Sequence, residues 1–449
     1  MDRQEAQSRM RLDQPFSRRT LLRGTGAGAL ALGAGGVLAA CGSGLKGSGP
    51  SGSTGTITIG FITPLTGSLA GFASGDKFVL SQIRQSPVYK NGIKIGGKTY
   101  KIAINVQDSQ SDPTRAGQVA QQLILNDKVD LILTTSAPET TNPVAVACEK
   151  FGTPCVSTVV PWESWYGGLG GNPVKPTTKF EYCTTFFFGL EQFLGTFEPM
   201  WNRIHTNKVV ACMYPNDPDG NAFRFGFEPL IKGSGYTVVD GGAYQDGTTD
   251  YTSMIADFKS HHCEVYSNAP LPPDFNTFWK QASQQGFKPK IATVAKVLLF
   301  PSDTVALGPL VVNIATDSWW GPYMPNHSSL TGQSAAELAT AYQQKTGNQW
   351  VQSLGSSYSL FEVAKEALAA VSDPHDKKEV ASALQTVSYT GMCGPLNFAA
   401  GPAPGVAIMA PVGVQWKKGT GTYPFEMKVV DNSLNKKVPI EAPLEPTNA

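Results

Sequence analysis

Short apolar stretches alternate with longer amphipathic stretches along the chain from about residue 56 onward. In the first half, the apolar, β-branched or alternating runs that favour strands cover residues 57–63, 100–108, 129–135 and 155–158. Helical stretches fall between these strands at residues 75–85, 112–126 and 139–151. Strands that alternate with helices in this way predict a parallel, doubly wound α/β sheet.

The same alternation returns in the second half of the chain. Predicted strands cover 208–214, 236–244, 264–268 and 290–296, and predicted helices cover 221–232, 251–261 and 275–285. Two strongly helical stretches, 334–346 and 357–371, follow, and the strand pattern resumes over 407–430. We therefore predict an α/β fold of two doubly wound, Rossmann-like lobes that are joined by a multi-strand hinge.

The first lobe is predicted to hold residues 56–182 and 315–390, and the second lobe residues 183–314 and 391–449. Ligands of doubly wound sheets bind beyond the carboxyl ends of the strands. The cleft between the two lobes is therefore the expected ligand site.

The first 40 residues do not follow this alternation and are typical of an export signal. Adjacent Arg18 and Arg19 precede a mildly apolar Gly/Ala run, which ends at Leu38-Ala39-Ala40-Cys41. The order of basic, apolar and small residues is that of a secretory signal, and the arginine pair resembles the twin-arginine type. We predict a signal peptide over 1–40, a lipid on Cys41 and a flexible Gly/Ser-rich tether over 41–55. The folded part would then work just outside a membrane.

The overall charge argues against nucleic acid as a partner. The 36 Lys and Arg residues nearly balance the 35 Asp and Glu residues, which leaves a formal net charge of +1. A nucleic-acid binder would show a basic stripe. We expect a monomer with a small-molecule ligand.

Seven cysteines suit an oxidising compartment if one of them carries lipid. Once Cys41 is set aside, six remain, and Cys148 and Cys155 flank a helix-to-strand turn. Their short separation makes them a candidate disulfide.

Patterns that would indicate an enzyme or a metal site are missing from the sequence. There is no G-x-S-x-G elbow, and the five histidines are scattered without the spacing of metal ligands. Residues 92–99 match the P-loop pattern, but a strand follows them where a phosphate site needs a helix. We interpret them as a Gly-rich turn, and we predict no catalytic residue, cofactor or metal.

Two groups of residues after predicted strands are candidates for ligand contact. Ser136 and Glu139 have the spacing of a helix capping box, in which each side chain accepts a backbone N–H of the other. The same helix start could also face a ligand. Aromatic residues gather near Trp162 and again near Trp319, where they either line a pocket or pack in the core.

The chain from about residue 57 to its end resembles the bacterial branched-chain amino-acid (Leu/Ile/Val) binding proteins, which have the type I periplasmic binding fold. The resemblance lies in the order and spacing of several short segments, namely residues 59–67, 108–113, 135–141, 154–158, 217–220 and 330–335. It implies a solute-binding lipoprotein, not an enzyme, that serves an ABC permease and its ATPase from the extracytoplasmic face of the cell membrane.

The resemblance also implies which residues bind the ligand. In that family, hydroxyl-rich turns after the third and fourth strands hold the ligand and an aromatic residue covers it. The corresponding residues here are Phe72 as the cover, Ser136, Glu139 and Thr140 in the first turn, Val159 and Trp162 in the second, and Asp219 and Leu271 from the second lobe.

Two departures from the family pattern leave the ligand open. Glu139 stands where the family usually has a small hydroxyl residue, and its charge would repel a ligand carboxylate. Trp162 is bulkier than the usual residue. An aromatic acid, an amide or another small organic molecule therefore stands beside an apolar amino acid. A sensor subunit for a membrane signalling partner is an alternative function, and a secreted hydrolase is disfavoured by the missing catalytic patterns.

Overall fold

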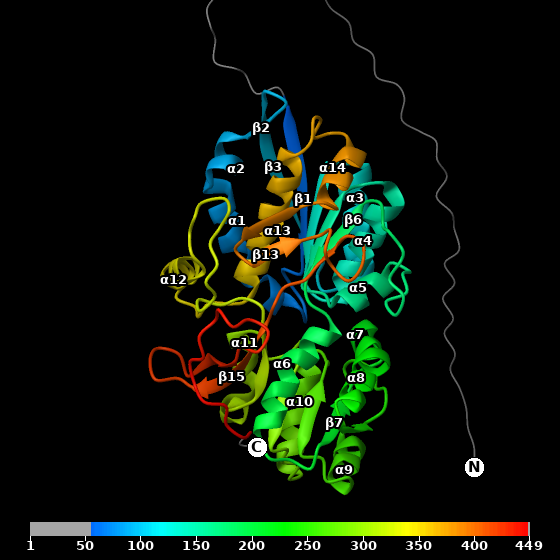
Figure 1. The fold of residues 1–449 in the computed structure, drawn as a ribbon, viewed down its shortest axis with the longest axis vertical. Coiled ribbons are helices and arrows are strands. Elements are labelled where there is room, and N and C mark those ends of the chain that lie inside the picture. Colours follow the sequence, from blue (N-terminus) through cyan, green and yellow to red (C-terminus); the bar gives the residue numbers. More distant parts are fainter. Residues whose placement is uncertain (1–54, 448–449) are drawn as a thin grey trace, which may run out of the picture. The chain divides into compact units, whose positions relative to one another are not determined.

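Two seven-stranded sheets organise residues 55–447, the part of the chain that the computed structural model describes (Figure 1). The strand order is β14-β6-β5-β4-β1-β3-β2 in the first sheet and β16-β15-β11-β10-β9-β7-β8 in the second. Most neighbouring strands are parallel, with antiparallel pairs at β2–β3, β11–β15 and β15–β16. The predicted α/β fold of two doubly wound lobes is confirmed.

The strands of the first sheet are β1 (Thr56–Thr63), β2 (Ile93–Ile95), β3 (Lys98–Asp108), β4 (Leu131–Thr135), β5 (Cys155–Thr158), β6 (Cys183–Phe186) and β14 (Val406–Ala407). The helices of this lobe are η1 (Ala70–Ala73), α1 (Asp76–Gln85), α2 (Pro87–Asn91), α3 (Pro113–Leu125), α4 (Pro138–Phe151), α5 (Trp162–Gly168), α13 (Ser353–Ala369) and α14 (Lys377–Leu384). Helix α12 (Ala335–Thr346) packs on α13, and so does the hairpin of β12 (Ser388–Gly391) and β13 (Gly394–Asn397).

The strands of the second sheet are β7 (Val209–Met213), β8 (Thr237–Asp240), β9 (Val265–Asn268), β10 (Ile291–Val294), β11 (Ala315–Ser318), β15 (Val412–Lys418) and β16 (Phe425–Asp431). The helices of this lobe are α6 (Leu190–Arg203), α7 (Pro218–Ala222), the π-helical turn η2 (Phe223–Phe227), α8 (Glu228–Gly233), α9 (Thr252–Ser260), α10 (Pro272–Gln284), α11 (Pro301–Leu307) and η3 (Gly308–Val311).

The chain crosses between the sheets after β6, after β11 and after β14. These crossings differ from the predicted lobe boundaries. Strand β6, whose residues were assigned to the second lobe, pairs with β5 in the first sheet. Strand β11, whose residues were assigned to the first lobe, pairs with β10 in the second sheet. Strand β14 also belongs to the first sheet. Hydrogen-bonded pairing with neighbouring strands decides which sheet each of these strands joins, because each strand is short and its own residues suit either sheet.

The Gly-rich segment that matches the P-loop pattern is a hairpin turn, as predicted. Gly96 and Gly97 join the antiparallel strands β2 and β3, and their φ angles are +54° and +79°. Such angles are readily adopted by glycine and suit a tight two-residue hairpin. The backbone therefore turns into a strand here, and no helix follows it.

Helix α6 was not predicted from the sequence. Gly195 and Pro199 lie inside this helix, and both residue types weaken the helical pattern of the sequence. Its apolar side chains, which include Phe197 and Trp201, are nevertheless buried in the core. Tertiary burial of this face outweighs the poor local propensity.

The predicted disulfide is absent from the structure. Cys148 and Cys155 are both buried free thiols, and so are the other four described cysteines. The predicted signal peptide over 1–40, the lipidated Cys41 and almost all of the 41–55 tether lie outside the described residues. Among residues 55–447, no helix is long and apolar enough to cross a bilayer.

Asp76 is a carboxyl buried in the core of the first lobe. Its side chain accepts hydrogen bonds from the hydroxyls of Thr63, at 2.6 Å, and Ser357, at 2.6 Å, and so ties β1 and α1 to α13. Burial raises the pKa of Asp76 to about 7, and these two hydrogen bonds only partly oppose the shift. The charged form is therefore disfavoured in the folded protein.

We expect Asp76→Asn to weaken the dependence of stability on pH. Because the pKa of Asp76 is higher in the folded chain than the usual value of 3.8 for an aspartate, its stabilising effect is greatest below pH 4 and fades as the pH rises to about 7. The measurement is the free energy of unfolding in urea across this range. The parent should lose more stability than the variant, by on the order of 1–4 kcal/mol. Equal losses would contradict a raised pKa of Asp76 in the folded protein.

Candidate ligand-binding site

A small cavity lies between the two lobes, at the carboxyl ends of the strands of both sheets. We call it the inner pocket, and its volume is about 30 Å³. The residues that line it are Phe72, Ala137, Val159, Pro161, Phe187, Phe193, Asp219, Phe223, Ala269, Ala295, Lys296, Leu299, Asp317 and Trp319. This volume holds one or two water molecules. A ligand the size of an amino acid enters only if the lobes separate or the side chains move.

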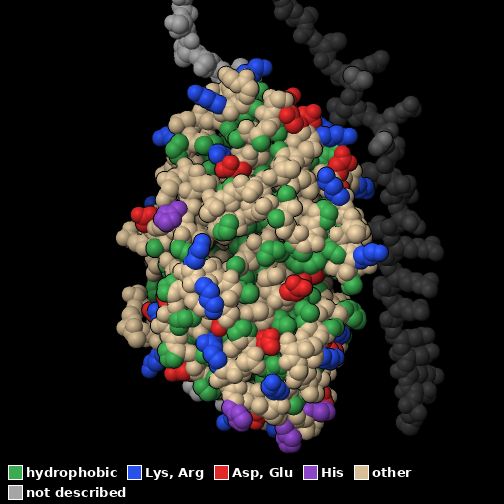
Figure 2. Space-filling view, in the orientation of Figure 1, with side chains coloured by type: hydrophobic (Ala, Val, Ile, Leu, Met, Phe, Trp, Pro, Cys, Tyr) green, Lys and Arg blue, Asp and Glu red, His purple; other side chains and the backbone are tan. Residues whose placement is uncertain are grey.

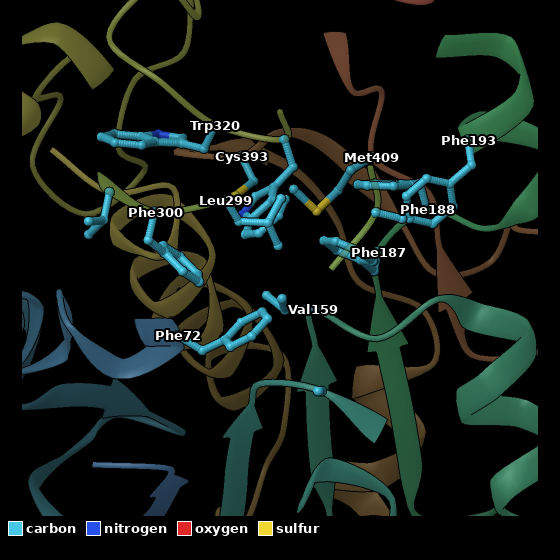
Figure 3. Close-up of a cluster of buried hydrophobic side chains, with 14 of the residues drawn as sticks. Phe72, Val159, Phe187, Phe188, Phe193, Leu299, Phe300, Trp320, Cys393 and Met409 are labelled. Atoms are coloured by element: carbon cyan, nitrogen blue, oxygen red, sulfur yellow. The ribbon is translucent and has the colours of Figure 1, made fainter. Parts of the chain in front are cut away.

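Five of the fourteen residues that line the inner pocket are aromatic. Figure 3 shows three of them, Phe72, Phe187 and Phe193, in a cluster of buried hydrophobic side chains. Phe72, from η1 in the first lobe, meets the edge of Phe300 from the second lobe at a centroid distance of 4.9 Å. Phe187 stacks on Phe188 at 4.1 Å and contacts Trp319 at 5.3 Å. The apolar faces of both lobes thus meet around the pocket, so that closure buries them from water.

Lys296 lies at the polar side of the inner pocket and joins the lobes. Its Nζ is 2.7 Å from Oε1 of Glu139 in the first lobe. In its own lobe, Nζ lies 3.1 Å from Oδ2 of Asp217 and 3.0 Å from Oδ2 of Asp219. Ser164 adds a second bridge, since its hydroxyl donates to Oδ1 of Asp219 at 3.1 Å. We call Lys296, Glu139, Asp217 and Asp219 the ionic cluster.

The ionic cluster carries more negative than positive groups, and it is buried. Burial disfavours the Lys296 ammonium, but the three carboxylates outweigh this and hold its pKa well above the usual value. Burial raises the pKa of Glu139 to about 7 although Lys296 opposes the shift. Burial also raises the pKa of Asp219. One ammonium therefore cannot neutralise all of these carboxyl groups at neutral pH.

Several polar atoms near the pocket have no hydrogen-bond partner in the described part of the chain. They include the hydroxyls of Ser136 and Thr140, Oδ1 of Asp317 and the indole N–H of Trp319. Burial raises the pKa of the Asp317 carboxyl to about 7. Buried polar groups are normally paired. Of these residues, Asp317 and Trp319 line the inner pocket, so their unpaired atoms are candidates for contact with a ligand or water.

The structure brings together only some of the predicted site residues. Phe72, Val159 and Asp219 line the inner pocket. Trp162 and Glu139 line a separate, larger cavity to which both lobes contribute, and which we call the outer groove.

Three other predicted residues line neither cavity. Ser136 and Thr140 are buried beside the start of α4, and Leu271 precedes α10. The predicted capping box is wrong, since the N-cap residue of α4 is Ala137 and Ser136 makes no capping bond. Glu139 instead turns to Lys296 because an ammonium attracts it more strongly than a backbone N–H.

The sequence analysis missed two charged residues of the inner pocket, Lys296 and Asp317. Both stand at the ends of strands, Lys296 shortly after β10 and Asp317 within β11. The rule that ligands bind beyond strand ends would have singled out Lys296. Asp317 had no such signal, because β11 was not predicted.

Two α/β lobes with a pocket between their strand ends define a bilobal binding protein. The chain belongs to the periplasmic binding protein family, whose sequence model matches residues 56–420. The family resemblance predicted from the sequence is thereby confirmed, and with it the type I fold.

A segment of 164 residues is 27% identical to Leu/Ile/Val-binding protein homolog 7 of Brucella abortus (strain 2308). That segment covers 36% of this chain and 39% of the relative, so the match spans less than half of the relative's length.

Solved structures share the fold over most of the chain. The leucine binding protein LivK of Thermotoga maritima MSB8 has a TM-score of 0.66 at 19% identity, and the match covers 83% of this chain and 98% of that one. LivJ of Streptococcus pneumoniae, in complex with isoleucine, has a TM-score of 0.63 at 17% identity, with 84% and 99% covered. A solute binding protein of Rhodopseudomonas palustris BisB5, in complex with 3,4-dihydroxy benzoic acid, has a TM-score of 0.62 at 17% identity, with 83% and 96% covered.

Proposed function

We propose that this protein is an extracytoplasmic solute-binding protein that delivers a small organic molecule to an ABC importer. The observation that carries the proposal is the inner pocket, which both lobes line and which Lys296 bridges to Glu139. The aromatic wall and the interlobe ion pair can form only when the lobes are closed. Closure by hinge motion around a ligand is the conformational change that a permease would recognise.

The proposed solute is an apolar amino acid or a related compound that has an apolar body and a polar end. Phe72 and Trp319 would contact the body. An ammonium would pair with Asp219 or Asp317, and a carboxylate would pair with Lys296. The proposal is supported by relatives that take isoleucine and an aromatic acid. Of the residues predicted as ligand contacts, Phe72, Val159 and Asp219 stay in this proposal.

A thermal-shift screen tests the function. Ligand that binds the folded chain stabilises it by RT ln(1 + [L]/Kd), which is about 2.7 kcal/mol at a hundredfold excess over Kd. We expect at least one apolar amino acid or aromatic acid to raise Tm, and small-angle scattering to show a more compact protein when it is bound. No shift with any member of such a library would contradict the proposal.

A sensor subunit would use the same closure to report to a membrane signalling partner. The two functions differ in what the liganded protein binds. A transport subunit stimulates the ATPase activity of its importer in vesicles, whereas a sensor subunit leaves it unchanged.

We propose that the protein works as a monomer held at the membrane by a lipid on Cys41, after removal of a signal peptide over 1–40. We expect mass spectrometry of the mature N-terminal peptide to show an acylated Cys41, and Cys41→Ala to move the protein from the membrane fraction to the soluble fraction. An unmodified Cys41 in membrane-extracted protein would contradict the anchor.

A further inference from the structure

The outer groove is a second and much larger cavity, with a volume of about 980 Å³. The first lobe lines it with α4, α5 and residues 173–174, and the second lobe lines it with α7, η2 and the starts of α6 and α8. Helix α5 packs against α7 across the cleft (Figure 1). A volume of this size accommodates a drug-sized organic molecule.

The lining of the outer groove is mostly apolar. Three of the eight large apolar side chains that are exposed in residues 55–447 lie here, namely Val146 at 43%, Val174 at 93% and Phe225 at 76% exposed. Figure 2 shows hydrophobic side chains next to an acidic one at mid-height of this face, where Figure 1 labels α5 and α7. Exposed apolar side chains that gather around one cavity indicate a binding surface.

The charges in the outer groove have one sign. Its lining holds three acidic residues, Glu139, Glu163 and Glu191, and no Lys or Arg among the described residues that form it. Elsewhere on the visible face, basic and acidic side chains are interspersed (Figure 2). Glu139 is already paired with Lys296, so Glu163 and Glu191 are the carboxyls that make the groove favour cations over carboxylates.

Three buried oxygen acceptors of the outer groove have no hydrogen-bond donor within residues 55–447. They are Oε2 of Glu139, Oε2 of Glu163 and Oδ1 of Asn142. Each side chain is fixed by its other polar atom: Glu139 by Lys296, Glu163 by the N–H of Leu190 at 2.9 Å, and Asn142 by donation to the carbonyl of Ser164 at 3.1 Å. Asn142 is only 7% exposed. All three acceptors are thus held in place and lack a hydrogen-bond donor.

Glu163 is the carboxyl whose charged form a positive ligand would stabilise most. Burial raises its pKa to about 7, and no cation is among the groups that oppose this shift. A positive charge beside it would favour the carboxylate. Trp162, next to Glu163 in α5, adds an aromatic ring to the same wall, and cations are attracted to aromatic faces.

We propose that the outer groove binds an apolar organic amine, with its protonated nitrogen near Glu139, Glu163 and Asn142 and its apolar body against Val146, Val174 and Phe225. This site is separate from the inner pocket. Both lobes contribute to it, so occupancy stabilises the closed arrangement. The inference does not depend on which solute the inner pocket takes.

Three probes that share one apolar body test the charge preference: 4-phenylbutylamine, 4-phenylbutanol and 4-phenylbutanoic acid. We measure their affinities for the full chain by isothermal titration calorimetry at about pH 8, where the carboxyls are largely charged and the amine is protonated. We expect the amine to bind at least about tenfold more tightly than the acid, with the alcohol between them, because charged hydrogen bonds are worth about tenfold or more.

Two variants test the location. Glu163→Gln keeps the acceptor for Leu190 and removes the charge, and we expect it to weaken amine binding about tenfold. Phe225→Ala removes an exposed side chain, so we expect the variant to fold like the parent. It should weaken the binding of all three probes. Glu181→Gln and Val305→Ala are matched controls at exposed positions outside the groove, and they should change nothing.

The inference is overturned if the acid binds as tightly as the amine, if the amine does not bind at about 1 mM, or if both groove variants bind it like the parent. Failure of the proposed function is distinguishable from these results. A solute of the inner pocket, found by the thermal-shift screen, should keep its affinity in Phe225→Ala and lose it in variants of the inner pocket.

Discussion

Replacing Lys296 by methionine is expected to lower the free energy of unfolding at neutral pH by about 3–5 kcal/mol. The variant leaves Glu139, Asp217 and Asp219 buried together without their cation. Removing one partner of a buried ion pair costs about this much, because the remaining charge stays desolvated. Urea unfolding at pH 7, followed by circular dichroism, measures the loss.

The loss should depend on pH in a defined direction. Without Lys296, the main group that opposes the burial-driven rise in the pKa of Glu139 and Asp219 is gone, and the hydrogen bond from Ser164 to Asp219 opposes it only in part. Protonated carboxyls cost less to bury, so the variant should recover stability as the pH falls from about 8 to 5. Lys378→Met is the control, since this lysine is 75% exposed and should cost at most about 0.5 kcal/mol. An equal loss in both variants would show that the ionic cluster does not stabilise the folded protein.

Phe72→Ala is expected to weaken binding of a verified solute about thirtyfold, because truncating a buried aromatic contact commonly costs about 2 kcal/mol. Phe72 lines the inner pocket and also packs against Phe300 of the other lobe. Stability should therefore fall as well, by about 3–5 kcal/mol if the cavity does not collapse. Calorimetric Kd and the unfolding midpoint are measured on the same preparation.

Phe258→Ala separates these two effects. Phe258 is buried in α9 of the second lobe and does not line the inner pocket. It should lower the unfolding midpoint and leave the Kd of the folded protein unchanged. If Phe72→Ala behaves in the same way, Phe72 is a core residue and the solute binds elsewhere.

Periodicity determined most of the fold of this chain. Strand β5 was predicted at its observed bounds, and β1 and β3 within two residues. Strands β1 and β5 are short apolar, β-branched runs, and β3 alternates between polar and apolar residues. Fully buried strands such as β4 are recognisable without knowing what covers them. The motif order then indicated the family, and the strand-end rule indicated the cleft.

Pairing and burial decided what the local pattern left open. Strands β6 and β11 are four residues long, and only their neighbours in the sheets assign them to a lobe. Helix α6 forms despite Gly195 and Pro199 because the core buries its apolar face. No window of sequence contains the information that fixes these elements.

Glu139 shows the same division at the level of one side chain. Its sequence neighbours suggest a capping box with Ser136, which is a local interaction and so was predicted. The structure instead pairs Glu139 with Lys296, which is 157 positions away in the other lobe. The sequence by itself determined two α/β lobes with a cleft at their strand ends; only the tertiary structure decided which charges meet across that cleft, because such a pair exists only once both sheets are folded and face each other.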